Sequence, residues 1–139
     1  MPVATRYLAL ESDGNCDIQD ITDDVRTELR ATSLKNGTVT VFVPGATGGV
    51  TTLEFEEGLI KDLREMFEAI APQGKRYHHD QKWHDGNGHS HVRASLLGPS
   101  LTVPFCASEL VLGTWQQIVF IDFDVRPRSR KLVLQFVGE

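Results

Sequence analysis

Strand-like segments lie towards both ends of this chain, and only two strong helical patterns interrupt them. The last segment is the clearest, because Leu132, Leu134 and Phe136 alternate with residues that would face the other side of a sheet. Further strands are expected at residues 3–10, 38–43, 50–55, 101–105, 110–112 and 115–123. Strands and helices do not alternate one by one, which argues against parallel β-α-β units. The sequence therefore predicts an α+β fold with a mostly antiparallel, β-sandwich-like sheet core.

Two main helices and a short one are expected within this framework. The first follows Asp20, and the second, over residues 59–70, has apolar residues on one face and charged residues on the other. The short helix covers residues 89–97, with Asn87 as its cap and Gly98 as its stop. The chain of 139 residues contains no repeat or linker, so residues 1–139 are expected to form one domain.

Composition narrows the functional classes. The net charge of −5 argues against a general nucleic-acid binder, which would usually be basic. No apolar run has transmembrane length, so no membrane partner is expected. The first residues lack the layout of a signal peptide, which favours a cytoplasmic location. In that compartment Cys16 and Cys106, which lack C-x-x-C spacing, are expected to be free thiols.

All five histidines fall between His78 and His91, interleaved with Asp80, Asp85 and Asn87. Imidazole is the commonest protein ligand for metals and the side chain that titrates nearest neutrality. Zinc-finger spacings are absent, so an open site using His78, His91 and one other ligand is the metal hypothesis. His89 and His91 would share a face on a strand but would point about 200° apart on a helix. The alternative is a solvated loop whose histidines hydrogen-bond locally.

Two further segments are candidates for anion binding. The glycine-rich loop at residues 44–49 offers bare backbone N–H groups, although a structural turn is favoured because the loop lacks a Walker motif. The basic run at residues 126–131 contains Arg128, whose guanidinium group suits phosphate. The alternative for this run is a turn in which arginines pair with Asp122 and Asp124.

Large polar and aromatic side chains near the C-terminus have two interpretations. Core packing of Trp115 is favoured over stacking on a ligand. Gln116 or Gln117 is expected to face inward, where it would line a site or an interface. The carboxylates of Glu54, Glu56 and Glu57 precede the stronger helix and suit its N-terminus, although Glu54 lies close enough to the glycine loop to reach a metal.

Two blocks together resemble a known family. Residues 85–100 read DGNGHSHVRASLLGPS and residues 112–118 read LGTWQQI, and in this combination the chain is similar to the YjbQ-like family over residues 5–138. Members are often described as secondary thiamine-phosphate synthases. The resemblance implies a YjbQ-like α+β domain, a homotrimer, a histidine-lined pocket at the subunit interface, and a weak ability to join a pyrimidine pyrophosphate to a thiazole phosphate.

One departure from the family concerns the glycine loop, where Gly45 stands in the place of a histidine found in many relatives. His89 either substitutes for that histidine, or the pocket binds an anion without a metal. The expected catalytic residues are His78, Asn87 and His91. The expected metal ligands are His78, His89 and His91, for zinc or another transition metal acting as a Lewis acid. Residues expected to bind the phosphorylated small ligand are Thr47, Gly48, Gln116 and Arg128. The alternative function is a non-catalytic metal- or metabolite-binding homotrimer.

Overall fold

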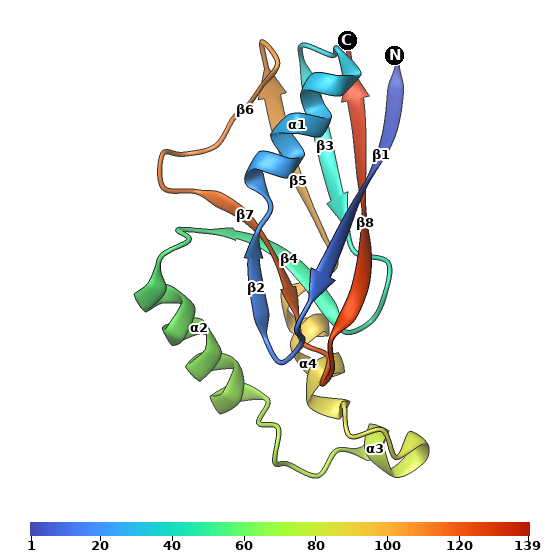
Figure 1. The fold of residues 1–139 in the computed structure, drawn as a ribbon, viewed down its shortest axis with the longest axis vertical. Coiled ribbons are helices and arrows are strands. Elements are labelled where there is room, and N and C mark those ends of the chain that lie inside the picture. Colours follow the sequence, from blue (N-terminus) through green and yellow to red (C-terminus); the bar gives the residue numbers. More distant parts are fainter.

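Two antiparallel sheets and four helices make up the computed structural model, which describes residues 1–139 (Figure 1). The strands are β1 (Val3–Ser12), β2 (Asp17–Asp20), β3 (Gly37–Phe42), β4 (Gly48–Leu53), β5 (Ser100–Cys106), β6 (Glu109–Leu110), β7 (Gln117–Asp122) and β8 (Arg128–Gly138). The helices are α1 (Thr22–Thr32), α2 (Glu57–Ile70), α3 (His78–Trp83) and α4 (Gly88–Leu97). The predicted α+β class is confirmed.

The larger sheet has the strand order β1-β8-β3-β5-β6, and the smaller sheet has the order β2-β7-β4. The long strands β1 and β8 of the larger sheet pair from Val3 opposite Val137 to Ser12 opposite Arg128, which places the two termini side by side (Figure 1). The alternation predicted for β8 is confirmed, because Leu132 and Leu134 are fully buried on its inner face.

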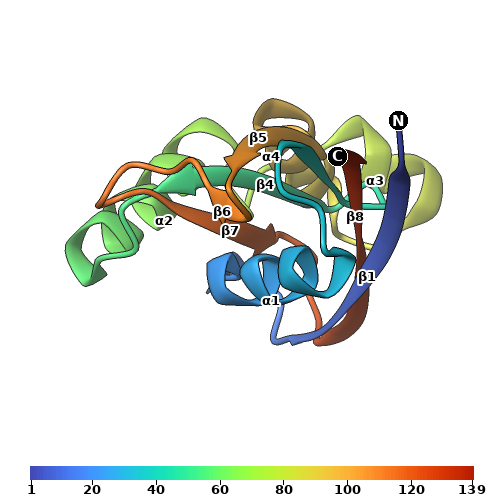
Figure 2. The same cartoon turned by 90° about the horizontal axis from the view of Figure 1, so that it is seen from above.

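The smaller sheet lies between two apolar layers. Ile118 and Phe120 of β7 join the main core against the larger sheet, whereas Val119 and Ile121 face α2 and α4. β7 is therefore buried on both faces, which explains its continuous apolar run. Seen from above, the sheets curl and α1 closes their open side (Figure 2).

Local sequence explains where the two main helices begin. The Asp20 carboxylate accepts hydrogen bonds from the backbone N–H of Thr22, at 3.0 Å, and from its hydroxyl. The Glu56 carboxylate accepts from the backbone N–H groups of Gly58 and Leu59, so the expected role of an acidic residue at this helix start is confirmed.

Two short elements were missed by sequence reasoning, and one residue was misplaced. α3 has six residues and no buried side chain, and β2 has four residues, so neither shows a readable hydrophobic period. The prediction that Trp115 packs in the core is wrong, since this residue is 72% exposed beside a turn closed by a hydrogen bond from Gln116 N–H to Gly113 O. Both cysteines are free as predicted, with Cys16 buried and Cys106 exposed.

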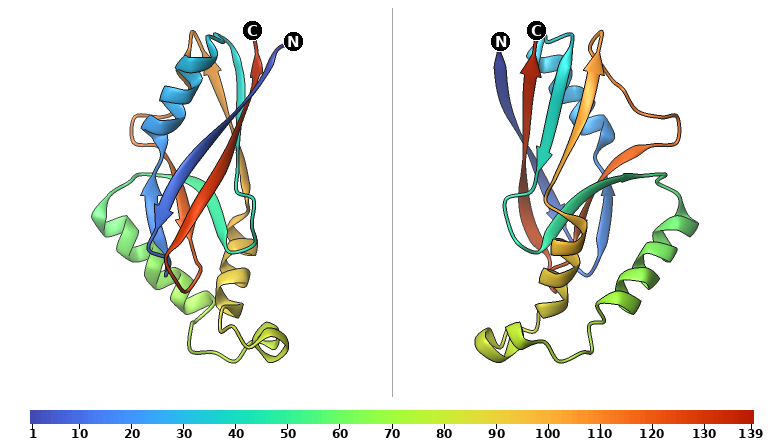
Figure 3. Two further views of the ribbon diagram at one scale, coloured as in Figure 1. Left: turned by 45° about the vertical axis from the view of Figure 1, so that its right-hand side comes forward. Right: turned by 180° about the vertical axis from the view of Figure 1, so that it is seen from behind.

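No helix or sheet covers the outer face of the larger sheet (Figure 3). Tyr7, Val133 and Phe42 form one row across this face, and Tyr7 and Phe42 are exposed. None of the four helices combines the length and apolar character needed to cross a membrane.

Candidate functional site

A cavity of about 160 Å³ lies between the loop after β3 and helix α4. Two backbone hydrogen bonds hold the end of α4 in place, from Val43 N–H to Pro99 O and from Val50 N–H to Gly98 O. The side of α4 that carries His91, Ala94 and Ser95 faces the loop across this cavity. The lining residues are Gly45, Ala46, Gly48, His91, Ala94, Ser95 and Pro99.

Close packing explains the glycines of this loop. Gly45 has φ +140°, which L residues rarely adopt, and a Cβ there would lie 3.2 Å from Nη1 of Arg130. A Cβ at Gly48 would lie 2.9 Å from the Phe120 ring. A histidine at position 45 would need a different loop conformation.

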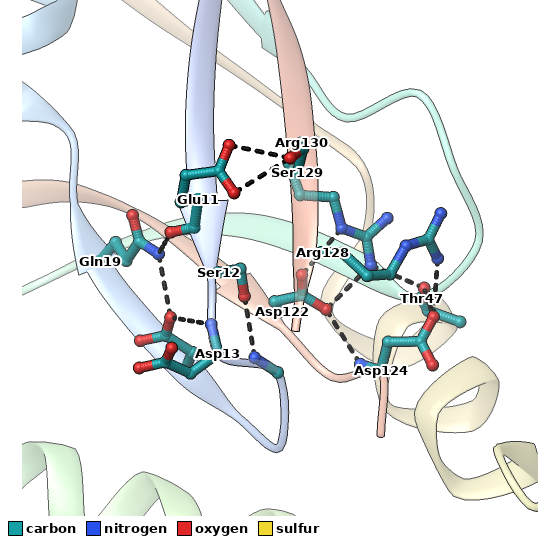
Figure 4. A network of polar contacts seen from close by, with 12 residues as sticks. Glu11, Ser12, Asp13, Gln19, Thr47, Asp122, Asp124, Arg128, Ser129 and Arg130 are labelled. Atoms are coloured by element: carbon teal, nitrogen blue, oxygen red, sulfur yellow. Dashed lines mark hydrogen bonds and ion pairs between the residues drawn. The ribbon is translucent and has the colours of Figure 1, made fainter. Parts of the chain in front are cut away.

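A buried polar network lies behind the loop (Figure 4). Arg130 donates two hydrogen bonds to Asp122, both of 2.8 Å, and a third of 2.8 Å to the Thr47 hydroxyl. Thr47 donates to Asp124 at 3.1 Å, and Arg128 donates to the same carboxylate at 2.7 Å. The pairing interpretation of the basic run is confirmed. The network contains two cations and two anions, so it balances its own charge.

Hydrogen bonds within the network shift the pKa values of Asp124 and Arg130 toward their charged forms. Burial alone would raise the pKa of Asp124, but hydrogen bonds from Arg128, the Val125 amide and Thr47 outweigh burial and lower it. The hydrogen bonds to Asp122 raise the pKa of Arg130 despite its burial. Arg130 therefore remains cationic near the loop.

Arg128 is half-buried and borders a second hollow of about 280 Å³ on the outer face of the larger sheet. Lys131 lies in the same hollow with its Nζ 4.4 Å above the centre of the Tyr7 ring. Pro44 lines this hollow, and the next residue, Gly45, lines the first cavity. The same loop therefore borders both.

His91 connects the first cavity to a second group of polar side chains. Its ring centre lies 4.2 Å from that of His79. Nδ1 of His79 faces one carboxylate oxygen of Asp80 at 3.7 Å and one of Asp85 at 3.6 Å. Burial, followed by the neighbouring His79, lowers the pKa of His91, which favours the neutral imidazole.

His89 points away from this cluster because residues 88–97 form a helix, on which neighbours two apart lie about 200° from each other. Its side chain is buried near Tyr77, with ring centres 6.4 Å apart, and its Nδ1 has no hydrogen-bond partner. Burial, followed by Arg93, lowers the pKa of His89. A metal site combining His89 with His91 is therefore not formed.

The family described as UPF0047 protein YjbQ-like matches residues 6–139. The chain belongs to this family. Among its YjbQ-like relatives, the UPF0047 protein of Archaeoglobus fulgidus is 39% identical over 128 residues, which cover 92% of this chain and 97% of the relative. That of Methanothermobacter thermautotrophicus is 35% identical over 139 residues, or 100% and 95% of the two chains. The expected family is confirmed.

Solved structures confirm the YjbQ-like fold. A hypothetical protein from Aeropyrum pernix superposes with a TM-score of 0.90 at 29% identity, over 98% of this chain and 99% of the other. A YbjQ-like protein of unknown function from Sulfolobus solfataricus gives a TM-score of 0.88 at 25% identity, over 99% and 100%.

The residues predicted for the YjbQ-like site do not lie together in the structure. His91 and Gly48 line the cavity, but the Thr47 hydroxyl faces inward, where it bonds to Asp124 and Arg130. Gln116 lies in another groove, where it bonds to the Gly113 backbone and the Thr52 hydroxyl.

The remaining predicted residues lie around α3. His78 is exposed at the start of α3 and does not line the cavity, so the predicted ligand set of His78, His89 and His91 is not brought together. Asn87 faces Asp85 instead of the cavity. Sequence reasoning favoured His78 and missed His79, although the interleaved Asp80 and Asp85 were the available signal.

Proposed function

We propose that this YjbQ-like protein binds and acts on a phosphorylated small molecule at the cavity between the 44–48 loop and α4. The observation that carries the proposal is the position of His91, which lines a cavity whose opposite wall is a glycine-rich loop. His91 would exchange a proton with the ligand, while backbone N–H groups of the loop would bind phosphate oxygens.

The second hollow supplies the cations for a phosphate group. Arg128 uses Nη1 for Asp124, and its partly exposed guanidinium group has further donors. Lys131 lies beside it. Two hollows bordered by one loop suit a reaction with two phosphorylated substrates, as in the joining of a pyrimidine pyrophosphate to a thiazole phosphate. The proposal is thus a thiamine-phosphate-synthase-like transferase, with zinc or another divalent transition metal as its cofactor, in the cytoplasm.

The proposal includes a homotrimer. Its support is the uncovered outer face of the larger sheet, which exposes Val3, Tyr7 and Phe42. A second copy seated on this face would also close the hollow that Tyr7 and Arg128 share. Sedimentation velocity tests this part: Phe42→Asp should give monomers, whereas Leu96→Asp, a control on exposed α4 surface, should not.

Activity is tested by incubating the purified chain with the two phosphorylated substrates and measuring thiamine phosphate. We expect slow turnover that His91→Ala abolishes and Arg128→Gln reduces, with His84→Asn, at an exposed position, as the control. Stoichiometric pyrophosphate binding without turnover would instead support the alternative, a non-catalytic metal- or metabolite-binding homotrimer. If neither pyrophosphate binding nor turnover is observed, the proposal of a phosphorylated ligand is refuted.

A further inference from the structure

We infer that a divalent transition-metal ion binds between His79, Asp80 and Asp85, where α3 leads into α4. One ligand atom from each residue lies within 4.8 Å of the other two. This site differs from the histidine set predicted from the sequence, since it uses one imidazole and two carboxylates. Metal binding here stands on its own geometry, and only its role in the reaction rests on the proposed function.

The spacing of the three groups fits a cation better than a direct hydrogen bond. Nδ1 of His79 lies 3.7 Å from Asp80 and 3.6 Å from Asp85, and this buried nitrogen has no hydrogen-bond partner. A histidine that only paired with the carboxylates would approach them to about 2.7–2.9 Å. Ligands around tetrahedral zinc, with bonds of about 2.0–2.1 Å, lie about 3.3 Å apart, so closing around an ion needs a contraction of a few tenths of an ångström at the imidazole.

The charges of the neighbouring side chains also favour a bound cation. Two carboxylates converge on this point, and no lysine or arginine forms an ion pair with either of them. Like charges held this close repel each other unless a cation lies between them. A bound divalent ion would supply that charge, whereas the Arg–Asp network behind the loop is already balanced.

Neighbouring groups orient the three ligands. The Gly88 backbone N–H donates to Asp80 at 2.9 Å. The Asn87 amide, with its nitrogen turned toward Asp85, lies 3.0 and 3.2 Å from the two carboxylate oxygens. The His91 ring lies against His79, with the two ring planes tilted by 35°. Outer contacts of this kind set the direction of metal ligands and tune their affinity.

One imidazole and two carboxylates suit zinc or manganese, and three protein ligands leave a coordination position open. The His79 ligand lies against His91, with ring centres 4.2 Å apart, and His91 lines the cavity of the proposed function. The site thus deepens that function, because an open metal position can take a phosphate oxygen of the ligand.

The test is isothermal titration of the chelator-treated chain with ZnCl₂, and separately with MnCl₂, without any phosphorylated compound. We expect one equivalent per chain for at least one of the metals. His79→Gln and Asp85→Asn should abolish that binding, and Asn87→Ala should weaken it by about 10- to 100-fold. His78→Gln is the matched control, because this neighbouring exposed histidine lies outside the cluster and its loss should leave the affinity unchanged.

Circular dichroism of each variant shows whether it folds, and Asp85 lies outside the helices, so Asp85→Asn keeps the test available if His79→Gln unfolds. Absence of binding for both metals would overturn the site, as would binding that survives Asp85→Asn or that His78→Gln removes. Pyrophosphate titrations are run separately. Pyrophosphate binding with no metal binding overturns this site alone, whereas metal binding with neither pyrophosphate binding nor turnover overturns only the proposed function.

Discussion

Replacing Arg130 by methionine should destabilise the fold more than the same replacement of Arg128, the other cation of the polar network. Arg130 and Asp122 are 5% and 0% exposed at their side chains, and Arg130 donates three hydrogen bonds of 2.8 Å. Arg130→Met would leave Asp122 as a buried carboxylate whose remaining donor is the Asp124 backbone N–H at 3.0 Å. Removing one partner of such a pair costs about 3–5 kcal/mol of unfolding free energy.

The matched control is Arg128→Met, which removes the other cation of the network. The Arg128 side chain is 39% exposed, so water screens its pair with Asp124 and the expected cost is below about 1 kcal/mol. Urea unfolding followed by far-UV circular dichroism measures both variants. Several protein concentrations are needed because a trimer would make the midpoint depend on concentration.

A double variant separates the buried charge from the lost packing. Asp122→Asn combined with Arg130→Met removes the isolated charge, so it should be more stable than Arg130→Met alone. A difference of less than about 1 kcal/mol between Arg130→Met and Arg128→Met, or a double variant that recovers no stability, would show that the unpaired Asp122 charge is not what destabilises the fold.

Three further predictions concern packing, pH and thiol chemistry. Gly88→Ala should cost about 1–3 kcal/mol in urea unfolding, because a Cβ there would lie 2.5 Å from Cβ of Tyr77; a neutral change would contradict the packing. The folded chain lowers the pKa of His89, so the unfolded chain binds more protons below about pH 6.5, and stability should fall as the pH drops through that value. His89→Gln should reduce the slope of the unfolding free energy between about pH 7.5 and 5, with the contribution of His91 remaining, and an unchanged slope would exclude His89 as a cause. In a Cys106→Ser background, Cys16 should react with a thiol reagent only after unfolding, because burial shields it and raises its pKa; rapid labelling of the folded chain would show an open site.

The regular spacing of apolar residues predicted those helices and strands that bury one face against the core. The alternation in β8 and the four-residue spacing in α1 were readable because each apolar position meets the core at a regular interval. The short helix was predictable at residues 89–97 from its Asn87 and Gly98 boundaries. α3 escaped prediction because it buries no side chain, and Trp115 escaped because the turn beside it directs it outward.

The fold class, the family blocks and the segment that carries every histidine can be read from the amino-acid order alone. Which of these groups lie together depends on how the helices and strands pack. The helical phase of α4 sends His89 into the interior and His91 toward the loop. Likewise, the Thr47 hydroxyl meets Arg130, 83 residues away, because the loop after β3 packs against the start of β8. Spacing along a chain sets local direction, but contacts between distant segments depend on how whole elements pack.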